Sequence, residues 1–204
     1  MRTRILYILF LFIFTSIYFC DELSKDQLDK IKEVTEDVNK APDFTLKSLH
    51  LEHDSTYVLS KMNDNVVLIN FWATWCSPCR LEIPDFNELF NKYHKDGFEI
   101  LSISTSDTKE QLVNFLKAYK VDYPLLYDKP SVIQKVMIDY GGIYSIPMSF
   151  LIGKNNEIVR VYPGAILKQY DPNMYADLVY NIETSLKNKS IKKRLEPIIN
   201  SEDK

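Results

Sequence analysis

A pair of cysteines two residues apart is the feature of this sequence most suited to chemistry. Cys76 and Cys79 enclose Ser77 and Pro78 and follow an apolar run of the kind that forms a buried strand. If a helix begins at the pair, its unpaired backbone N–H groups and its dipole lower the pKa of the first cysteine, because they favour thiolate over thiol. We therefore predict a redox site, with Cys76 exposed at the helix start as its nucleophile.

Three elements must position this pair. The run at 66–72 is apolar apart from Asn70, which is typical of a central strand covered on both faces. The helix after the cysteines should bury apolar side chains spaced by three and four residues, and Pro84 should kink it. A second buried strand is expected at 98–104. The cysteines are then expected where a central strand leads into a helix.

The order of elements predicts an α/β fold. Beyond 98–104 come two helices with a short strand at 123–127 between them, then a hairpin at 148–162 and a final helix. The starts of the two helices that follow the strand at 98–104 are predicted from capping-box patterns, Asp107 with Glu110 and Ser131 with Gln134. The alternation indicates a central mixed sheet with a mainly parallel core and helices on both faces.

Whole-chain composition is that of one globular domain with short appendages. Of 204 residues, 46% are hydrophobic and 26% are charged, and the formal net charge is −3. Basic and acidic residues are intermixed, so there is no basic stripe to neutralise a row of phosphates, and nucleic acid is not expected as a partner. The three cysteines are too few for a disulfide-scaffolded fold.

Residues 1–20 have the pattern of a signal peptide or membrane anchor. Arg2 and Arg4 precede a largely apolar run at 5–19, which is shorter than the ~20 residues that a bilayer-spanning helix needs. The basic residues orient the amino end toward the cytoplasm. We therefore expect everything after residue 20 to lie outside the cytoplasm, in the periplasm or on the outer face of the membrane.

Cys20 follows this apolar run directly and resembles the lipid-attachment site of bacterial lipoproteins. Ile17 suits that pattern, but Phe19 stands where the processing peptidase normally takes Gly, Ala or Ser, and Tyr18 is also bulky. Three interpretations stay open: a lipid on Cys20, an uncleaved signal anchor, and a cysteine with no role. The first two tether the domain to a membrane.

Composition along the chain suggests its division. We expect a charged tether at 21–40, a folded domain at 41–188 that opens with a hairpin of short strands, and a charged C-terminal tail at 189–204. His50 and His53 lie in the turn of that hairpin, but zinc needs four ligands, or three and a water, and no further Cys or His is nearby. We interpret them as loop residues and expect no metal.

Four motifs occur in an order that is typical of one family. They are Ala41-Pro42-Asp43-Phe44, Asn70-Phe71-Trp72-Ala73-Thr74-Trp75-Cys76, Arg80-x-Glu82-x-Pro84 and Ile146-Pro147, and the resemblance that they carry spans about residues 41–187. The chain thus resembles the thioredoxin superfamily and, more narrowly, the TlpA/ResA-like extracytoplasmic thiol-disulfide oxidoreductases with an AhpC/TSA-Redoxin-like domain. The resemblance implies a thioredoxin-like fold with an N-terminal β-hairpin and an extra helix-strand insertion.

Two positions separate this subfamily from thioredoxin itself. Thioredoxin has a buried aspartate six residues before the first cysteine, where this chain has Asn70, which does not titrate. The resembling subfamily has a glutamate three residues after the second cysteine, and here that residue is Glu82. Helical spacing brings it near Cys79, so it is the candidate to take that thiol's proton. The alternative is a solvated glutamate in the first helical turn.

By resemblance, the reaction is dithiol–disulfide exchange. Cys76 attacks a partner disulfide as thiolate, and Cys79 attacks the resulting mixed disulfide and releases the partner reduced. The reverse sequence oxidises a dithiol. No cofactor beyond the Cys76–Cys79 disulfide is implied. The other residues expected to shape the site or bind substrate are Trp75, Ser77, Pro78, Ile146 and Pro147, with the Ile146-Pro147 bond in cis and the Ile146 backbone pairing with the substrate.

The resemblance also implies partners and a direction. Its members reduce cysteines of apocytochrome c or of other exported proteins, and they draw electrons through a membrane protein of the CcdA/DsbD kind. Two other functions are kept open. A peroxiredoxin-type thiol peroxidase shares the scaffold, but its Pro-x-x-x-Thr-x-x-Cys pattern is not matched around Cys76. A redox-inactive exported binding module is disfavoured by the intact cysteine pair.

Overall fold

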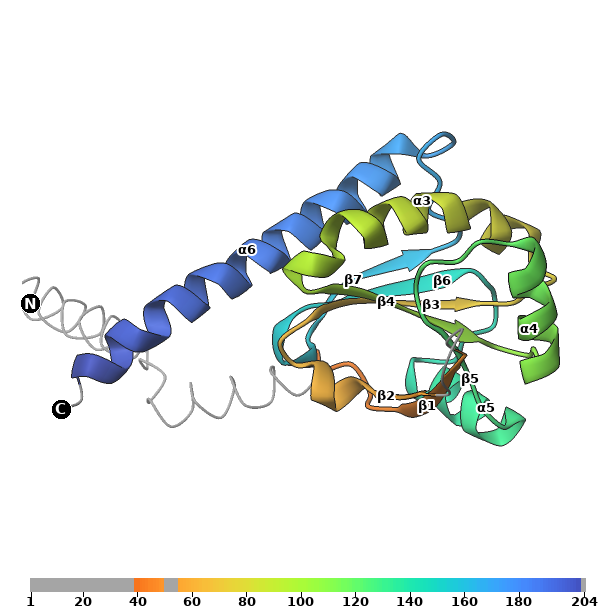
Figure 1. Cartoon of the computed structure of the whole chain (residues 1–204), viewed down its shortest axis with the longest axis horizontal. Coiled ribbons are helices and arrows are strands. Elements are labelled where there is room, and N and C mark those ends of the chain that lie inside the picture. The colour runs from red at the N-terminus through yellow and green to blue at the C-terminus, as the bar shows by residue number, and fades with distance from the viewer. Residues whose placement is uncertain (1–38, 50–54, 203–204) are drawn as a thin grey trace, which may run out of the picture. The chain divides into compact units, whose positions relative to one another are not determined.

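The computed structural model describes residues 39–49 and 55–202, with side chains as far as residue 187. Within it, Lys40–Lys204 form one compact unit, and Figure 1 shows its elements. The predicted export segment at 1–20 with Cys20, and the two histidines His50 and His53, lie outside the described residues. The predictions made for them, and for the domain boundaries, stay predictions.

A seven-stranded mixed sheet forms the middle of the unit, in the order β2-β1-β5-β4-β3-β6-β7. β3, β4 and β5 are parallel to one another, whereas the pairs β1–β2, β1–β5, β3–β6 and β6–β7 are antiparallel. The prediction of a mainly parallel core therefore holds for the three central strands alone, because a hairpin at each edge reverses the chain. The strands are β1 (Thr45–Leu49), β2 (Ser55–Val58), β3 (Val66–Trp72), β4 (Phe98–Ser104), β5 (Leu125–Tyr127), β6 (Met148–Ile152) and β7 (Ile158–Pro163).

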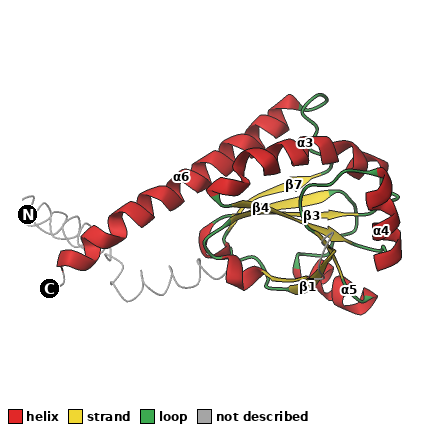
Figure 2. Ribbon diagram, in the orientation of Figure 1, coloured by secondary structure: helices red, strands yellow, loops and turns green. Residues whose placement is uncertain are grey.

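Helices cover both faces of this sheet, as Figures 1 and 2 show. On one face of the sheet, α3 and α6 pack in a core that includes Leu68 of β3. On the other face, α5 packs in a core that includes Ile69 of β3. α4 and β5 form a helix-strand unit between β4 and α5, in keeping with the expected insertion. The helices are α3 (Ser77–Tyr93), α4 (Lys109–Ala118), α5 (Pro130–Asp139) and α6 (Pro172–Glu202), with short 3₁₀ turns η1 (Leu59–Met62), η2 (His94–Asp96) and η3 (Lys154–Asn156).

β3 and β4 have the bounds that their apolar runs predict. Every residue of β3 is buried, because successive side chains point to opposite faces and both faces are covered by helices. At the end of α3 and η2, Gly97 takes a φ of 94°, a left-handed conformation that suits glycine. The chain can then turn directly into β4, parallel to β3.

The two predicted capping boxes are wrong in position. α4 begins after Thr108, whose side chain accepts from the Gln111 N–H while the Gln111 side chain accepts from the Thr108 N–H. Asp107 does not cap it, because other donors occupy its carboxylate. α5 begins at Pro130 and has no side-chain cap. Proline suits this first position, because the N–H that it lacks would have no acceptor within the helix.

Candidate active site

The two cysteines form a disulfide at the start of α3, the helix that follows β3. Their sulfur atoms are 2.01 Å apart. Cys76 is the N-cap residue, and its Sγ accepts a hydrogen bond from the Cys79 N–H at 3.3 Å. The reactive pair thus lies where unpaired N–H groups and the helix dipole favour negative charge.

Cys76 is buried rather than exposed, which corrects the prediction. It is 4% exposed and Cys79 1%. The sulfur of Cys76 faces both Cys79 and the carbonyl oxygen of Ile146, which lies 3.9 Å away. The loop that contains Ile146 thus covers the Cys76 sulfur, which the start of α3 alone would leave exposed. Of the two cysteines, Cys76 is still the slightly more exposed residue.

The Ile146-Pro147 peptide bond is cis, as the resemblance implied. It precedes β6, which pairs antiparallel with β3, so strand pairing carries the loop to the end of β3 from which the cysteines follow. This places the Ile146 carbonyl next to Cys76.

Glu82 is buried behind the cysteines and is not a solvated surface residue. It is 1% exposed. One carboxylate oxygen, Oε1, accepts from Asn70 Nδ2 at 2.9 Å, and the other, Oε2, accepts from the Ile166 N–H at 3.1 Å. Cys79 and Glu82 are three residues apart on α3 and both are buried, which places their side chains as neighbours on one side of the helix.

Burial raises the pKa of the Glu82 carboxyl from 4.5 to about 8. The main cause is loss of water around the charged form, and the nearby charge of Asp85 adds to it. The hydrogen bonds from Ile166 and Asn70 act in the opposite direction, because they favour the carboxylate. A carboxyl with this pKa exchanges protons near neutral pH, as a general acid or base requires.

Three polar residues in register on the central strands support Glu82. Asn70 on β3 is opposite Ser102 on β4 and Ser149 on β6. Its Nδ2 also donates to Ser149 Oγ at 3.1 Å, and its Oδ1 accepts from Ser102 Oγ at 2.9 Å. All three are at most 2% exposed. Sequence reasoning missed the two serines, although polar residues inside apolar strands are a usable signal.

Asp107, which the sequence wrongly predicted as a helix cap, bonds instead to the turn before Cys76. Its carboxylate accepts from the Thr74 N–H at 2.8 Å, from Thr74 Oγ1 at 2.6 Å and from Ser104 Oγ at 2.7 Å. It is 7% exposed. Asp107 therefore anchors the two-residue turn before Cys76 to the end of β4.

The exposed rim of the site is formed by the residues next to Cys76. Trp75 is 65% exposed and its indole N–H donates to Ser106 Oγ at 3.0 Å. Ser77 and Pro78 are also exposed, as first residues of α3. Beside Ser106 a pocket of about 470 Å³ extends along the ends of β4 and β5, and Lys47 and Lys129 contribute to its lining. Pro84 lies inside α3, six residues after Pro78.

Neither a metal centre nor a membrane-spanning helix is found in the part of the chain that the structure describes. No three His, Cys, Asp or Glu side chains there are grouped to hold a metal ion. Among residues 39–49 and 55–202, no helix is both long and apolar enough to cross a membrane.

A mixed sheet between helices, a Cys-x-x-Cys at a helix start and a cis-proline loop against it define a thioredoxin-fold protein of dithiol–disulfide exchange. Comparison with known proteins agrees with this class. A model of the AhpC/TSA family matches residues 38–161. This chain belongs to that family and, within it, to the ResA-type thiol-disulfide oxidoreductases.

The relatives support that assignment over most of the folded unit. ResA of Oceanobacillus iheyensis is 35% identical over 127 residues, which is 62% of this chain and 64% of that protein. ResA of Bacillus thuringiensis is 33% identical over 139 residues, 68% of this chain and 76% of the relative. A thiol:disulfide interchange protein of the thioredoxin family from Chlorobium tepidum has a TM-score of 0.59 at 27% identity, covering 72% of this chain and 96% of its own.

Proposed function

We propose that this protein is a membrane-tethered reductant of disulfides in exported proteins, apocytochrome c among them. The observation that carries the proposal is the buried Glu82, with its pKa raised to about 8, one turn behind Cys79. A residue that accepts a proton near neutral pH is what the second, buried thiol needs in order to attack. The named relatives are thiol-disulfide oxidoreductases, which supports this chemistry.

The reaction starts from the dithiol form. The Cys76 thiolate, stabilised by the helix start, attacks one sulfur of the substrate disulfide; a new S–S bond joins the two proteins, and the other substrate sulfur leaves as thiolate. Glu82 then takes the proton of Cys79, whose sulfur attacks Cys76 Sγ. The Cys76–Cys79 disulfide forms, the second substrate thiolate leaves, and two electrons have passed to the substrate.

Direction depends on what regenerates the dithiol. Disulfides persist outside the cytoplasm, so a reductant there needs its own electron supply. We propose a membrane donor of the CcdA/DsbD kind, which would attack the Cys76–Cys79 disulfide by the same two steps in reverse. Tethering through residues 1–20, by an anchor helix or by a lipid on Cys20, would keep the site near that donor.

Trapping the mixed disulfide tests substrate and direction together. In cells, a Cys79→Ala variant stops after the first step and should accumulate exported proteins bound to Cys76. A Cys76→Ala, Cys79→Ala double variant is the matched control and should trap none. The trapped proteins should carry more disulfides when the gene is deleted. Capture of none, or trapped proteins that lose disulfides on deletion, contradicts the proposed reduction.

Three further measurements separate the remaining alternatives. The mass of the mature N-terminus distinguishes a lipid on Cys20 from a retained anchor and from a cleaved, untethered chain. Steady hydrogen peroxide turnover far above that of Cys79→Ser, with no disulfide substrate present, would favour a peroxidase. A wild-type pair that does not cycle with dithiothreitol would favour the redox-inactive module.

A further inference from the structure

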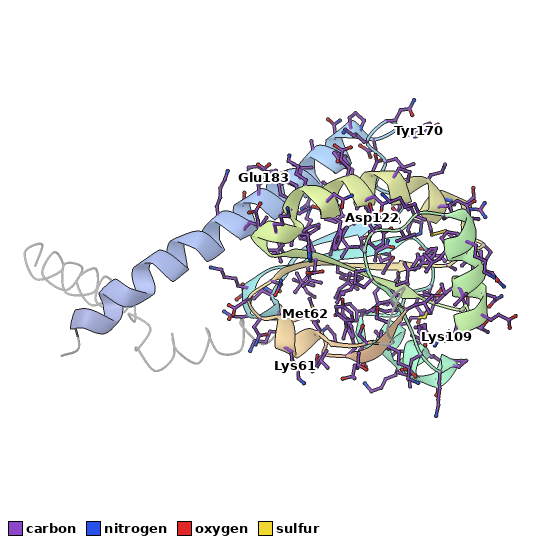
Figure 3. The ribbon with its side chains drawn as sticks, viewed as in Figure 1. Lys61, Met62, Lys109, Asp122, Tyr170 and Glu183 are labelled. Carbon is purple, nitrogen blue, oxygen red and sulfur yellow. A yellow bond between two sulfur atoms is a disulfide. The ribbon has the colours of Figure 1, made fainter. Side chains whose placement is uncertain are left out.

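The last helix, α6, continues beyond the part that packs on the sheet. Its core residues are Tyr175, Leu178, Ile182 and Leu186. Tyr93 Oη donates to Glu183 Oε1 at 2.6 Å and holds the same part of α6 against α3; Glu183 is labelled in Figure 3. The helix then runs on to Glu202, past the end of the sheet in Figure 1. We call residues 187–202 the C-terminal extension.

The C-terminal extension begins with a block of positive charge. Residues 187–194 include five basic residues and no acidic one: Lys187, Lys189, Lys192, Lys193 and Arg194. The formal net charge of the whole chain is −3, so the rest of the chain has a larger net negative charge. Lys187, the first residue of the block, is exposed. A local positive field on an otherwise acidic protein favours an anionic partner.

The apolar residues of the C-terminal extension lie on a different side of α6 from its core residues. They follow one another at helical spacing and are Ile191, Leu195, Ile198 and Ile199. Ile191 comes nine residues after Ile182, and Leu195 comes nine residues after Leu186. Nine residues are about two and a half turns of an α-helix, so each pair is on opposite sides of α6. This second apolar stripe therefore does not continue the face that packs on the sheet.

We propose that the C-terminal extension binds the surface of a bilayer that contains anionic phospholipid, through its apolar stripe and its basic block. A helix that combines an apolar stripe with many Lys and Arg is typical of segments that lie in the plane of a membrane interface. The inference does not depend on disulfide exchange. It also goes beyond the proposed function, in which only residues 1–20 contact the membrane. Contacts from both ends of the chain would limit how far the folded unit turns away from the bilayer.

Charge favours this partner over two others that an amphipathic helix could bind. A second copy of the chain would bring an identical block of five positive charges against the first, and like charges repel. A nucleic acid would neutralise the block but would leave the four apolar residues without a contact. An anionic bilayer accounts for both features, because its headgroups attract the basic residues and its acyl boundary takes up the apolar ones.

The test follows the exchange of backbone amide hydrogens at 188–199 in the full-length protein by mass spectrometry. Vesicles consist of phosphatidylcholine alone or of phosphatidylcholine mixed with phosphatidylglycerol. The predicted apolar segment at 1–20 carries the protein to either vesicle, so the difference between them reports on the C-terminal extension. We expect exchange at least about tenfold slower with the mixed vesicles, because binding protects the helix amides, and high salt should remove the difference.

Charge variants test the basic block. Lys192→Gln with Lys193→Gln should remove most of the difference between the vesicles, because each basic residue near an anionic surface contributes about fivefold to binding. Lys61→Gln with Lys95→Gln is the matched control, since it removes the same charge from two exposed lysines elsewhere; Lys61 is labelled in Figure 3. The control should behave as wild type.

Ile191→Ser with Leu195→Ser tests the apolar stripe. It keeps every charge and should also reduce the difference, because burial of apolar side chains contributes to interfacial binding. Equal exchange with both vesicles overturns the inference, as does a Lys192→Gln, Lys193→Gln protein that matches wild type. So does slowing without lipid that grows with protein concentration, which would indicate a second copy. None of these substitutions is near the cysteines, so every variant should cycle with dithiothreitol, and the proposed function is tested separately.

Discussion

Asn70 Nδ2 donates a hydrogen bond of 2.9 Å to Glu82 Oε1, joining the middle of the central strand to the redox helix. The other partners of Asn70 are the hydroxyls of Ser102 and Ser149 on the neighbouring strands. The hydrogen bond from Asn70 favours the ionised Glu82 carboxyl, in opposition to the burial that raises its pKa.

Replacing Glu82 should change how stability depends on pH. The unfolded carboxyl has a pKa of about 4.3, whereas the folded one is raised to about 8. Between these values the folded state holds the extra proton, so the free energy of unfolding falls as pH rises, by at most about 1.4 kcal/mol per pH unit. That stabilisation is complete below the unfolded pKa and lost above the folded pKa. Glu82→Gln should flatten this slope in urea titrations from pH 5 to 8, and an unchanged slope would contradict the buried titration.

The same substitution should slow the step that belongs to Cys79. In wild type, the rate at which Cys79 resolves a mixed disulfide on Cys76 should rise with pH toward about 8 as Glu82 ionises. Glu82→Gln removes the acceptor and should lower the rate at pH 7 by about 10²-fold, the usual size of a general-base effect. Stopped-flow reaction with a glutathione adduct of Cys76 measures it. Glu88→Gln, an exposed carboxyl on the same helix, should behave as wild type. Equal rates in both variants would leave Glu82 without this role.

Asp107→Asn should destabilise the fold and loosen the turn before Cys76. The asparagine NH₂ group would face a donor, either Thr74 or Ser104, that now bonds to the carboxylate. A buried donor without an acceptor costs about 1–3 kcal/mol, which urea unfolding should show. Asp128→Asn is the control, because the bond shown for Asp128 is to the adjacent Lys129 N–H. If the two variants are equally stable, Asp107 does not anchor the turn.

The two adjacent glycines before Tyr144 offer a matched pair of substitutions. Both have left-handed φ values, 88° at Gly141 and 82° at Gly142, so alanine at either should cost about 1–2 kcal/mol. A Cβ on Gly141 meets nothing within 4 Å, whereas one on Gly142 meets the Tyr144 ring. The ring is exposed and can move, so the two variants should be similarly stable in thermal unfolding. A Gly142→Ala protein that unfolds at a clearly lower temperature than Gly141→Ala would show that the ring does not move aside.

Much of this fold follows from local patterns. The bounds of β3 and β4 are those of two apolar runs, because a strand buried on both faces requires an unbroken apolar stretch. The Cys-x-x-Cys and the helix after it were also predictable, since the capping geometry at Cys76 involves atoms a few residues apart. The helix start at Asp107 was not, because its carboxylate bonds to Thr74, 33 residues away.

The sequence by itself determined the redox pair, the central strand before it and the identity of a carboxyl one turn behind. Tertiary structure decided what those residues experience. Burial in the folded unit raises the pKa of Glu82, and the hydrogen bonds from the Ile166 N–H, 84 residues away, and from Asn70 offset part of that rise. Cys76 is covered because the Ile146 loop, 70 residues away, lies against its sulfur. Side-chain periodicity specifies which face of an element is buried, but strand order and register decide which distant groups meet there.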